Sequence, residues 1–343
     1  MNSDVNPASP DLGPAYVVGL DAGGTRTRAV LARLGGGGPE GEGVSGPGNA
    51  LTVPGHQLTE HLAEALALAV PEALRGRVVA VAGGFAGASR TAPDEPGRIR
   101  AHAALTVALS RLGIEAGSVE IHSDIEAAFA SAAGTPADGL ALVAGTGAVA
   151  VRITGRVCAE TVGGDGWLLG DDGGGFWIGR EAVRAALRMA DGRGGPTALG
   201  ASVGRALEVP EDVVPPDAPG PYDTGTWTRA RREAYRMHVL PAVMDGPPVR
   251  LARLAPLVAE AARHEDTVAA RILEAASDHL TDTVRALEPR PGERIVASGG
   301  LLGPAGPLTG LLATRLRPLG LALDWVVDGS RGAVALARLG YGG

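Results

Sequence analysis

Two stretches of the chain share one pattern of apolar and polar positions, and the rest of the sequence is arranged around them. Tyr16–Leu34 and Leu140–Thr154 each begin with an apolar run, pass through a short glycine-rich turn, and continue with alternating polar and apolar residues. An apolar run followed by an alternating one predicts two strands joined as a β-hairpin. Two hairpins of one design predict a duplicated domain, with one copy in each half of the chain.

Between and after the hairpins, the apolar residues follow helical and strand spacing in turn. In the first half the pattern predicts a helix over residues 55–74, a strand over 77–84, a helix over 98–112, a strand over 119–124 and a helix over 125–133. In the second half it predicts helices over residues 176–189, 229–244, 252–263, 267–286 and 331–339, with strands over 293–298 and 321–327. The Pro- and Gly-rich segment 191–226 is interpreted as a loop or lid with one short helix. Strands alternating with helices are typical of an α/β fold.

The turn of the first hairpin, Asp21-Ala22-Gly23-Gly24-Thr25, carries residues suited to binding phosphate. Gly23 and Gly24 allow positive φ and leave backbone N–H groups open to an anion, and Thr25 adds a hydroxyl. The carboxylate of Asp21 cannot bind phosphate directly, but it can hold a hydrated Mg²⁺ that does. By itself, this stretch is explained equally well as an ordinary hairpin turn.

The turn of the second hairpin, Gly145-Thr146-Gly147, favours the phosphate interpretation. It repeats the glycines and the hydroxyl of the first turn, and it lacks an acid. Two phosphate-sized turns, one in each copy of a duplicated domain, predict a pair of loops that clamp a polyphosphate from both sides.

Composition narrows the chemistry that is available at such a site. The chain of 343 residues has 31 basic residues, all of them arginine, and it has no lysine. P-loop nucleotidases, the protein-kinase fold and Schiff-base or PLP enzymes all need a lysine, so these classes are excluded. Any ATP site must therefore use glycine amides, hydroxyls and Mg²⁺.

Charge, cysteine content and the lengths of the apolar runs limit the classes of protein and of binding partner that fit this chain. The net charge of −7 argues against nucleic acid, and no apolar run is long enough to span a membrane. One cysteine, Cys158, excludes a disulfide framework within one chain. Residues 1–15 lack the basic and apolar segments of a signal peptide, so we expect a disordered leader on a cytoplasmic protein.

The paired turns resemble the two phosphate loops of the acetate/sugar kinase, Hsp70 and actin superfamily. Within it, the chain from Tyr16 onward resembles the N-acetylglucosamine kinase branch of the BadF/BadG/BcrA/BcrD ATPase family. The resemblance implies an α/β fold of two ribonuclease-H-like (actin-type ATPase) domains with a central cleft. It implies an N-terminal domain over residues 16–123, with the C-terminal helix 331–343 packing back against it, and a larger C-terminal domain over residues 124–330. Relatives suggest a homodimer.

Asp124 stands where a predicted strand meets a predicted helix. From position alone, an N-cap residue that satisfies free helix amides is the simpler interpretation. In the sugar kinases that the chain resembles, an Asp at this junction accepts the proton of the sugar hydroxyl. The resemblance therefore implies that Asp124 is the general base and contacts the sugar, whereas His122 and Ser123 are expected to be packing and strand-end residues.

Gly163–Gly179, with the sequence GGDGWLLGDDGGGFWIG, is the most distinctive run of the chain. Its carboxylates suit paired sugar hydroxyls, and a Ca²⁺ or Mg²⁺ loop is the alternative, although the acids lack EF-hand spacing. The family's motif is close to G-D-E-G-S-G followed by an aromatic residue, Trp and Ile, and its Asp matches Asp171. The resemblance implies that Asp171 binds sugar hydroxyls, with further contacts from Gly164 and Asp165.

Two residues of this run depart from the family's motif. Asp172 replaces the Glu and Gly174 replaces the Ser, so one carboxylate is shorter and one hydroxyl is missing. These departures put the preference among sugars in doubt, and they leave the role implied for Asp171 unchanged.

Three further residues enter through the resemblance. The family places an Asn against the sugar in the loop that contains Asn49, which could otherwise be a plain turn residue. The superfamily's adenosine motif lies where Gly299 and Gly300 follow a predicted strand, and glycine there lets adenine and ribose approach the backbone. Asp328, by contrast, shows no ligand spacing and is expected to be a surface or capping residue.

The implied activity is ATP-dependent, Mg²⁺-assisted phosphorylation of an amino sugar, with N-acetylglucosamine and its 6-hydroxyl favoured. Glucosamine, N-acetylmuramic acid, its anhydro form and glucose stay open as alternatives. An ATPase activator of 2-hydroxyacyl-CoA dehydratases is disfavoured, because its subunits each give two cysteines to a shared iron–sulfur cluster. A non-catalytic sugar sensor or repressor is also disfavoured, because Asp21 and Asp124 are present and the first fifteen residues cannot form a helix-turn-helix.

Overall fold

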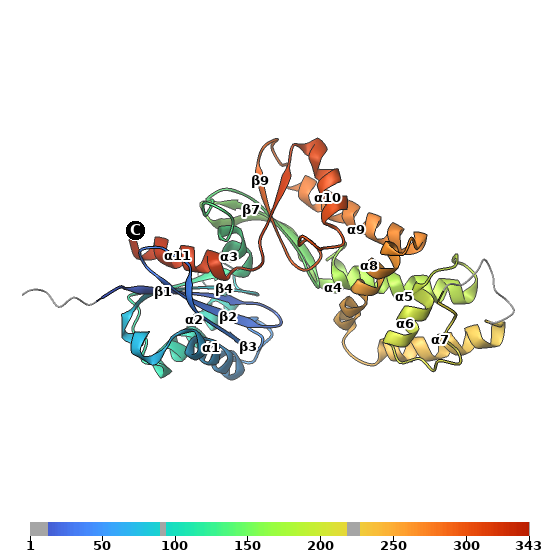
Figure 1. The fold of residues 1–343 in the computed structure, drawn as a ribbon, viewed down its shortest axis with the longest axis horizontal. Helices are drawn as coiled ribbons and strands as arrows, with labels where there is room; N and C mark the ends of the chain where they lie inside the picture. Colours follow the sequence, from blue (N-terminus) through green and yellow to red (C-terminus); the bar gives the residue numbers. More distant parts are fainter. Residues whose placement is uncertain (1–12, 90–93, 218–226, 343) are drawn as a thin grey trace, which may run out of the picture. The chain divides into compact units, whose positions relative to one another are not determined.

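The structure is a computed structural model that describes residues 13–89, 94–217 and 227–342 of the chain. The described chain forms two compact units, and each is an α/β body with its own five-stranded sheet (Figure 1). The predicted α/β fold with two similar domains is therefore confirmed. The leader expected over residues 1–15 lies outside the described residues as far as residue 12.

The two units divide the chain differently from the expected domains. The first unit is Met1–Pro136 with Asp328–Gly343, and the second is Ala137–Val327. The division falls after Pro136 rather than between residues 123 and 124, because the helix α3 (Asp124–Ala130) packs on the sheet of the first unit.

The first unit is built on the strands β1 (Tyr16–Ala22), β2 (Thr27–Arg33), β3 (Pro39–Ser45), β4 (Val78–Phe85) and β5 (Ser118–Ser123). Their order in the sheet is β3-β2-β1-β4-β5. β1, β2 and β3 pair antiparallel, and β4 and β5 continue the sheet parallel to β1. The first predicted hairpin is therefore β1–β2, with Ala22 opposite Thr27 across its turn.

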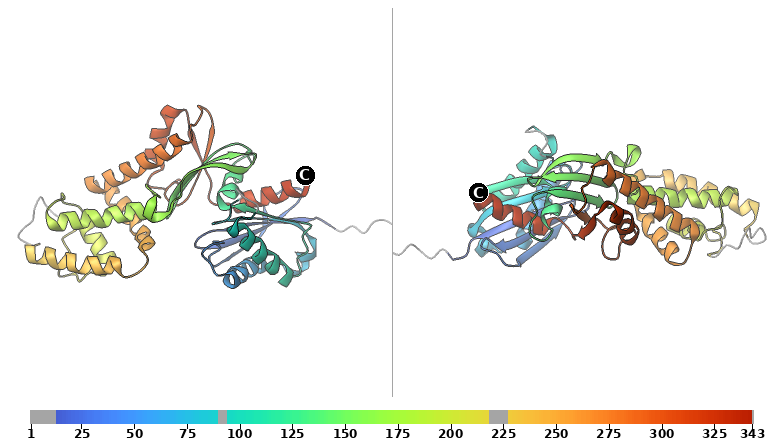
Figure 2. Two further views of the ribbon diagram at one scale, coloured as in Figure 1. Left: turned by 180° about the vertical axis from the view of Figure 1, so that it is seen from behind. Right: turned by 90° about the horizontal axis from the view of Figure 1, so that it is seen from above.

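Helices cover both faces of this sheet. α1 (Gly55–Ala69) and α2 (Pro96–Arg111) lie on one face, and α3 and α11 (Ser330–Gly342) lie on the other (Figures 1 and 2). Val18 packs in the apolar cluster of α1 and α2, whereas its neighbour Val17 packs with Val334 of α11. Because β1 is buried on both faces, its sequence is a continuous apolar run rather than an alternating one.

The second unit repeats this sheet with β6 (Gly139–Ala144), β7 (Ala148–Thr154), β8 (Val157–Gly163), β9 (Arg294–Ser298) and β10 (Ala322–Trp325). The order β10-β9-β6-β7-β8 again joins an antiparallel meander to two parallel strands. Its helices are α4 (Gly166–Leu169), α5 (Gly175–Asp191), α6 (Leu199–Ala206), α7 (Arg229–Met244), α8 (Ala255–Arg263), α9 (Thr267–Ala286) and α10 (Thr309–Leu316). The short 3₁₀ segments of the two units are η1 (Glu72–Arg77), η2 (Pro248–Leu254) and η3 (Arg317–Leu319).

Some predicted elements end elsewhere in the structure. The helix predicted over residues 55–74 ends at Ala69, because Pro71 favours extended backbone before it and supplies no N–H. The helix predicted over residues 252–263 begins only at Ala255, after η2. The segment 191–226 contains α6, and its residues 218–226 lie outside the described chain.

Glycine allows α11 to pack closely in the first unit. A Cβ on Gly332 would overlap the backbone oxygen of Ala127 in α3, and it would lie 2.6 Å from the backbone nitrogen of Ser131. A Cβ on Gly19 of β1 would likewise overlap the backbone of Val334. The helix therefore contacts its neighbours backbone to backbone, and any side chain at these glycines would push it outward.

We expect Gly332→Ala to lower the free energy of unfolding by on the order of 1–3 kcal/mol, because the added methyl has no space. Gly310→Ala is the matched control, since a Cβ on this helical glycine of α10 would meet no atom within 4 Å. The control should be neutral or gain up to about 1 kcal/mol, as glycine is a poor helix former. Urea unfolding monitored by circular dichroism measures both, and equal stability of the two variants would contradict the close packing.

Candidate functional site

The carboxyl ends of β1, β4 and β5 lie at one edge of the first sheet. Asp21 of β1 is in register with Gly84 of β4, which is in register with His122 of β5. A Cβ on Gly84 would overlap the side chain of Ala127 and lie 3.4 Å from the Cα of Asp124. The missing side chain at Gly84 therefore allows α3 to begin directly at the sheet edge, which brings Asp124 to the end of the strand next to β1.

The Asp21 carboxylate is held in a partly buried, acidic environment. Burial raises its pKa from 3.8 to about 6, and the negative charges of Asp328 and then Asp124 add to the rise. The backbone N–H of Gly329 donates to Oδ2 of Asp21 at 3.3 Å and opposes the rise. A carboxylate in this state is stabilised by a cation, and one carboxylate with water ligands fits hydrated Mg²⁺.

Asp124 is the first residue of α3, and the helix does not need its side chain as a cap. Ser123 is the N-cap: its Oγ accepts from the N–H of Glu126 at 3.0 Å, and the Glu126 carboxylate accepts from the N–H of Ser123 at 3.0 Å. This capping box means that the N-cap interpretation of Asp124 is wrong. The Asp124 carboxylate accepts from the N–H of Ile125 at 3.0 Å, and burial raises its pKa.

The turn between β1 and β2 is open on its outer side. Gly24 and Thr25 are exposed, and a Cβ on Gly24 would meet no atom within 4 Å. Gly23 and Gly24 would allow positive φ, but neither adopts it. Since neither conformation nor packing requires glycine at position 24, what glycine provides there is unobstructed access to the backbone.

The loop that contains Asn49 is tied to this turn. The N–H of Gly48 donates to the carbonyl of Gly23 at 2.8 Å. Oδ1 of Asn49 accepts from the N–H groups of Leu51 at 2.9 Å and Thr52 at 3.0 Å, which makes an Asx turn. The structural role of Asn49 therefore uses its oxygen and leaves its amide NH₂ as the group that could donate to a ligand.

In the second unit, the turn between β6 and β7 supports the start of α5. The N–H groups of Gly175 and Phe176 donate to the carbonyls of Gly145 at 2.8 Å and Thr146 at 2.9 Å. A Cβ on Gly174 would lie 2.7 Å from the backbone carbon of Gly147. This contact gives a physical reason for glycine at position 174, because a serine there would need the turn to move.

Asp171 lies against the same turn. Its Oδ1 accepts from the N–H of Ala148 at 3.3 Å, and a Cβ on Gly147 would overlap its carboxylate. Burial raises the pKa of Asp171, with smaller contributions from the negative charges of Asp165 and Asp172. Asp171 also has φ +56°, a left-handed conformation that costs energy for a residue other than glycine. A half-buried carboxylate on strained backbone, with two other acids near it, is a candidate for ligand binding.

A pocket of about 480 Å³ joins two motifs that are far apart in the sequence. Gly145 and Thr146 of the second turn line it together with Gly300, which follows β9. Gly299 differs from its neighbour, since it has φ +101° and a Cβ on it would overlap the carbonyl of Ala144. Gly299 therefore shapes the backbone, while Gly300, with no atom within 4 Å of its Cβ position, leaves the pocket open.

Two groups of residues near these sites were not identified from the sequence. The small side chains of Ala252, Ala255 and Ala259 form a wall of the pocket, and no local motif marks them because they lie about 100 residues beyond the turn. Asp328 was expected to be a surface or capping residue. It does cap α11 by accepting from the N–H of Ser330 at 3.0 Å, but it is also partly buried and pairs with Arg28 at 2.5 Å.

The described residues contain neither a cluster of metal-ligating side chains nor a membrane-spanning helix. In that part of the chain, no three or more His, Cys, Asp or Glu side chains are grouped so that they could hold a metal ion directly. Within the same residues, no helix combines the length and the apolar character needed to cross a bilayer.

Comparisons with known proteins point to one family. The model of the BadF/BadG/BcrA/BcrD ATPase family matches residues 18–312. The chain is 27% identical over 236 residues to N-acetyl-D-glucosamine kinase of Dictyostelium discoideum, a match that spans 65% of this chain and 66%, just under two thirds, of that protein.

Two solved structures have a similar fold. They are provisionally named N-acetylglucosamine kinases from Chromobacterium violaceum, with a TM-score of 0.67 and 21% identity, and from Porphyromonas gingivalis, with a TM-score of 0.65 and 17% identity. Each match covers 94% of this chain and 99% of the other. At these identities the likeness shows a common fold.

We expect Asp21→Asn to stabilise the folded protein at pH 7.5. Because the folded-state pKa is raised from 3.8 to about 6, the charged form costs stability, and this cost appears as the pH rises from about 4 to 6. The rise corresponds to at most about 3 kcal/mol, which the variant regains. Asp282→Asn, at an exposed position of α9, is the control and should change nothing. Thermal unfolding at pH 7.5 and at pH 4 measures the difference, which should vanish at the lower pH; a gain equal at both pH values would contradict the prediction.

Proposed function

Since the chain belongs to the BadF/BadG/BcrA/BcrD ATPase family, we propose that it is an ATP-dependent amino-sugar kinase. The reaction transfers the γ-phosphoryl group of ATP to the 6-hydroxyl of N-acetylglucosamine and yields N-acetylglucosamine 6-phosphate and ADP. The observation that carries this proposal is Asp124: a partly buried carboxylate at the carboxyl end of the parallel strands β4 and β5 that is not the N-cap of its helix and forms no ion pair with a described residue.

The nucleotide part of the proposal rests on the pocket of the second unit. Adenosine enters beside Gly300, and the phosphates reach the Gly145–Gly147 turn, which lines the same pocket. The family resemblance assigns a second set of amides and a hydroxyl to the Gly23–Thr25 turn of the first unit. Arg263 is the one cationic side chain among the pocket's described lining residues, so phosphate binding depends mainly on backbone N–H groups.

Asp124 acts on the sugar hydroxyl that attacks the phosphoryl group. Phosphoryl transfer needs positioning and charge stabilisation more than strong base catalysis. A carboxylate within hydrogen-bond reach orients the hydroxyl and accepts its proton as the bond to phosphorus forms. Burial raises the pKa of Asp124, which makes it a better proton acceptor than an exposed aspartate.

Asp21 is the residue that would hold hydrated Mg²⁺, which when bound neutralises phosphate charge. Burial and the negative charges of Asp328 and Asp124 raise its pKa, so a cation would stabilise its charged form. The sugar contacts assigned from the family resemblance are Asn49, Asp124, Gly164, Asp165 and Asp171. The same resemblance leads us to propose a cytoplasmic homodimer, with glucosamine and N-acetylmuramic acid as the alternative substrates.

We expect Asp124→Asn to reduce sugar-dependent ADP release by about 100-fold or more, the usual effect of removing a general base. The assay couples ADP formation to a panel of N-acetylglucosamine, glucosamine, N-acetylmuramic acid and glucose. Asp282→Asn is the control for loss of an acid elsewhere and should keep wild-type rates. Preference for another amino sugar would change the substrate and keep the mechanism. A rate of ATP hydrolysis that does not depend on the sugar and is unchanged in Asp124→Asn would refute the proposal.

We expect Gly300→Leu to raise the KM for ATP by about tenfold or more, because its side chain would occupy the pocket and its Cβ would meet no atom within 4 Å. Gly310→Leu is the matched control, since it also adds a side chain to an open glycine, outside the pocket. Both variants should melt like the wild type. Unchanged ATP kinetics in Gly300→Leu would show that the nucleotide does not bind in this pocket.

A further inference from the structure

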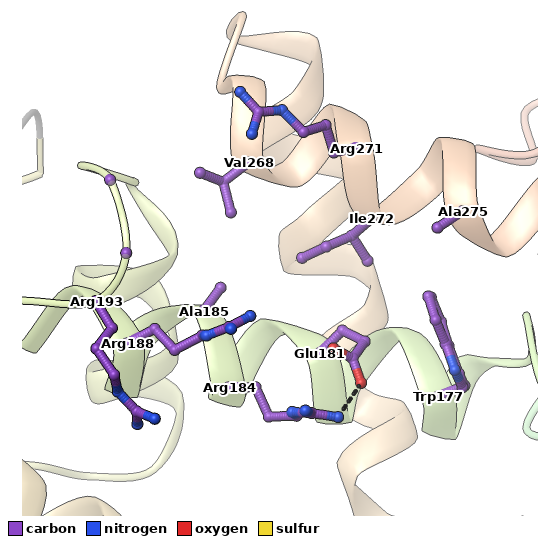
Figure 3. Close-up of a pocket in the computed structure, with 12 residues that line it drawn as sticks. Trp177, Glu181, Arg184, Ala185, Arg188, Arg193, Val268, Arg271, Ile272 and Ala275 are labelled. Carbon is purple, nitrogen blue, oxygen red and sulfur yellow. Dashed lines mark hydrogen bonds and ion pairs between the residues drawn. The ribbon is translucent and has the colours of Figure 1, made fainter. Parts of the chain in front are cut away.

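A second pocket of the Ala137–Val327 unit lies between α5 and α9, with the loop after α5 at one end (Figure 3). Its volume is about 470 Å³, which is within the range of small-molecule sites. It shares no lining residue with the pocket beside Gly300, so it is a separate feature of the unit. We call it the α5–α9 groove.

The groove has an apolar floor that comes from both helices. Ala185 of α5 and Val268, Ile272 and Ala275 of α9 line it, and Figure 3 shows these side chains between the two helices. Trp177 forms one end, where its ring lies edge-on to His279 with centroids 5.0 Å apart. This floor is a surface against which an apolar part of a ligand can pack.

Arginines rim the floor, which gives the groove a charge opposite to that of the chain. Four of its lining residues are arginines and one is Glu181, whereas the whole chain carries a net charge of −7. Arg184 is already neutralised by Glu181 at 3.1 Å, and Arg193 by Asp191 at 2.5 Å. A local reversal of charge on an acidic protein attracts anions to this surface.

The two remaining arginines stand on opposite walls. Arg188 belongs to α5 and Arg271 to α9, and both are exposed. Neither has an ion-pair partner within 4.0 Å in the part of the chain that the structure describes, although acids neutralise the arginines beside them. Two uncompensated guanidinium groups across an apolar floor can each bind a phosphate or carboxylate through paired N–H donors.

We propose that the α5–α9 groove binds a small organic anion with at least two negatively charged groups. Arg188 and Arg271 each bind one anionic group, and the carbon skeleton of the molecule packs against Val268 and Ile272. Because the groove shares no lining residue with the pocket assigned to ATP, it is a second binding site, distinct from that of the nucleotide. This assignment does not depend on the kinase reaction.

The test is calorimetric titration of the full-length protein with three probes, in the presence of a saturating non-hydrolysable ATP analogue. Fructose 1,6-bisphosphate carries two phosphates on a carbon skeleton, and citrate carries carboxylates on one. Pyrophosphate has two phosphates and no carbon skeleton. We expect the bisphosphate or citrate to bind more tightly than pyrophosphate, and the better of the two identifies phosphate or carboxylate as the preferred group.

Variants assign any binding to the groove. Arg188→Ala and Arg271→Ala should each raise the Kd by about tenfold or more, the usual effect of losing a charge-assisted hydrogen bond. Arg271→Lys should lose part of the affinity, because lysine keeps the charge without the paired donors. Arg285→Ala, which removes an arginine of α9 outside the groove, should leave the Kd unchanged.

Three results would overturn the proposal: no probe binds, binding survives in the Arg188→Ala and Arg271→Ala variants, or Arg285→Ala weakens binding equally. The three substituted arginines are all exposed, so melting curves should match the wild type and loss of binding is not loss of fold. The titration needs no turnover, so its failure is distinguishable from failure of the proposed kinase activity.

Discussion

Close packing at glycine, where no side chain could fit, is the constraint on which both candidate sites depend. In the first unit, α3 can begin at the edge of the sheet only because Gly84 has no side chain to meet Ala127. In the second unit, α5 can begin against the second turn only because position 174 is glycine. In each case the contact places the start of a helix beside the end of a strand. Polar and acidic groups are thereby concentrated where open α/β sheets bind ligands.

The electrostatics of the two units follow from this crowding and from the absence of lysine. Asp21, Asp124 and Asp171 are all drawn into surroundings that disfavour their charged forms, and burial is the main cause for each. No lysine is available to neutralise them or to bind phosphate. The chemistry therefore falls to backbone amides, to hydroxyls and to a divalent cation. Two arginines of the α5–α9 groove, Arg188 and Arg271, have no ion-pair partner among the described residues, and they suit a different ligand.

Local patterns predicted much of the fold and part of the site. The two hairpins were recognisable because an apolar run, a glycine-rich turn and a more polar run follow one another in each, and their repetition indicated the duplicated fold. Patterns failed where a neighbour decides the outcome. Gly23 and Gly24 allow positive φ, yet the turn closes without using it. Asp124 looked like an N-cap, yet Ser123 and Glu126 cap the helix between them.

The sequence by itself determined which residue types could do chemistry and at which strand ends they stand, because periodicity and turn composition are local properties. Only the tertiary structure decided what surrounds them. It placed Asp328 against Asp21, about 300 residues away, and Gly300 in one pocket with the Gly145–Gly147 turn. The pKa of a carboxylate, the walls of a pocket and the pairing of an arginine depend on atoms that are close in space and distant along the chain. The spacing of residues along the sequence therefore cannot predict these three properties.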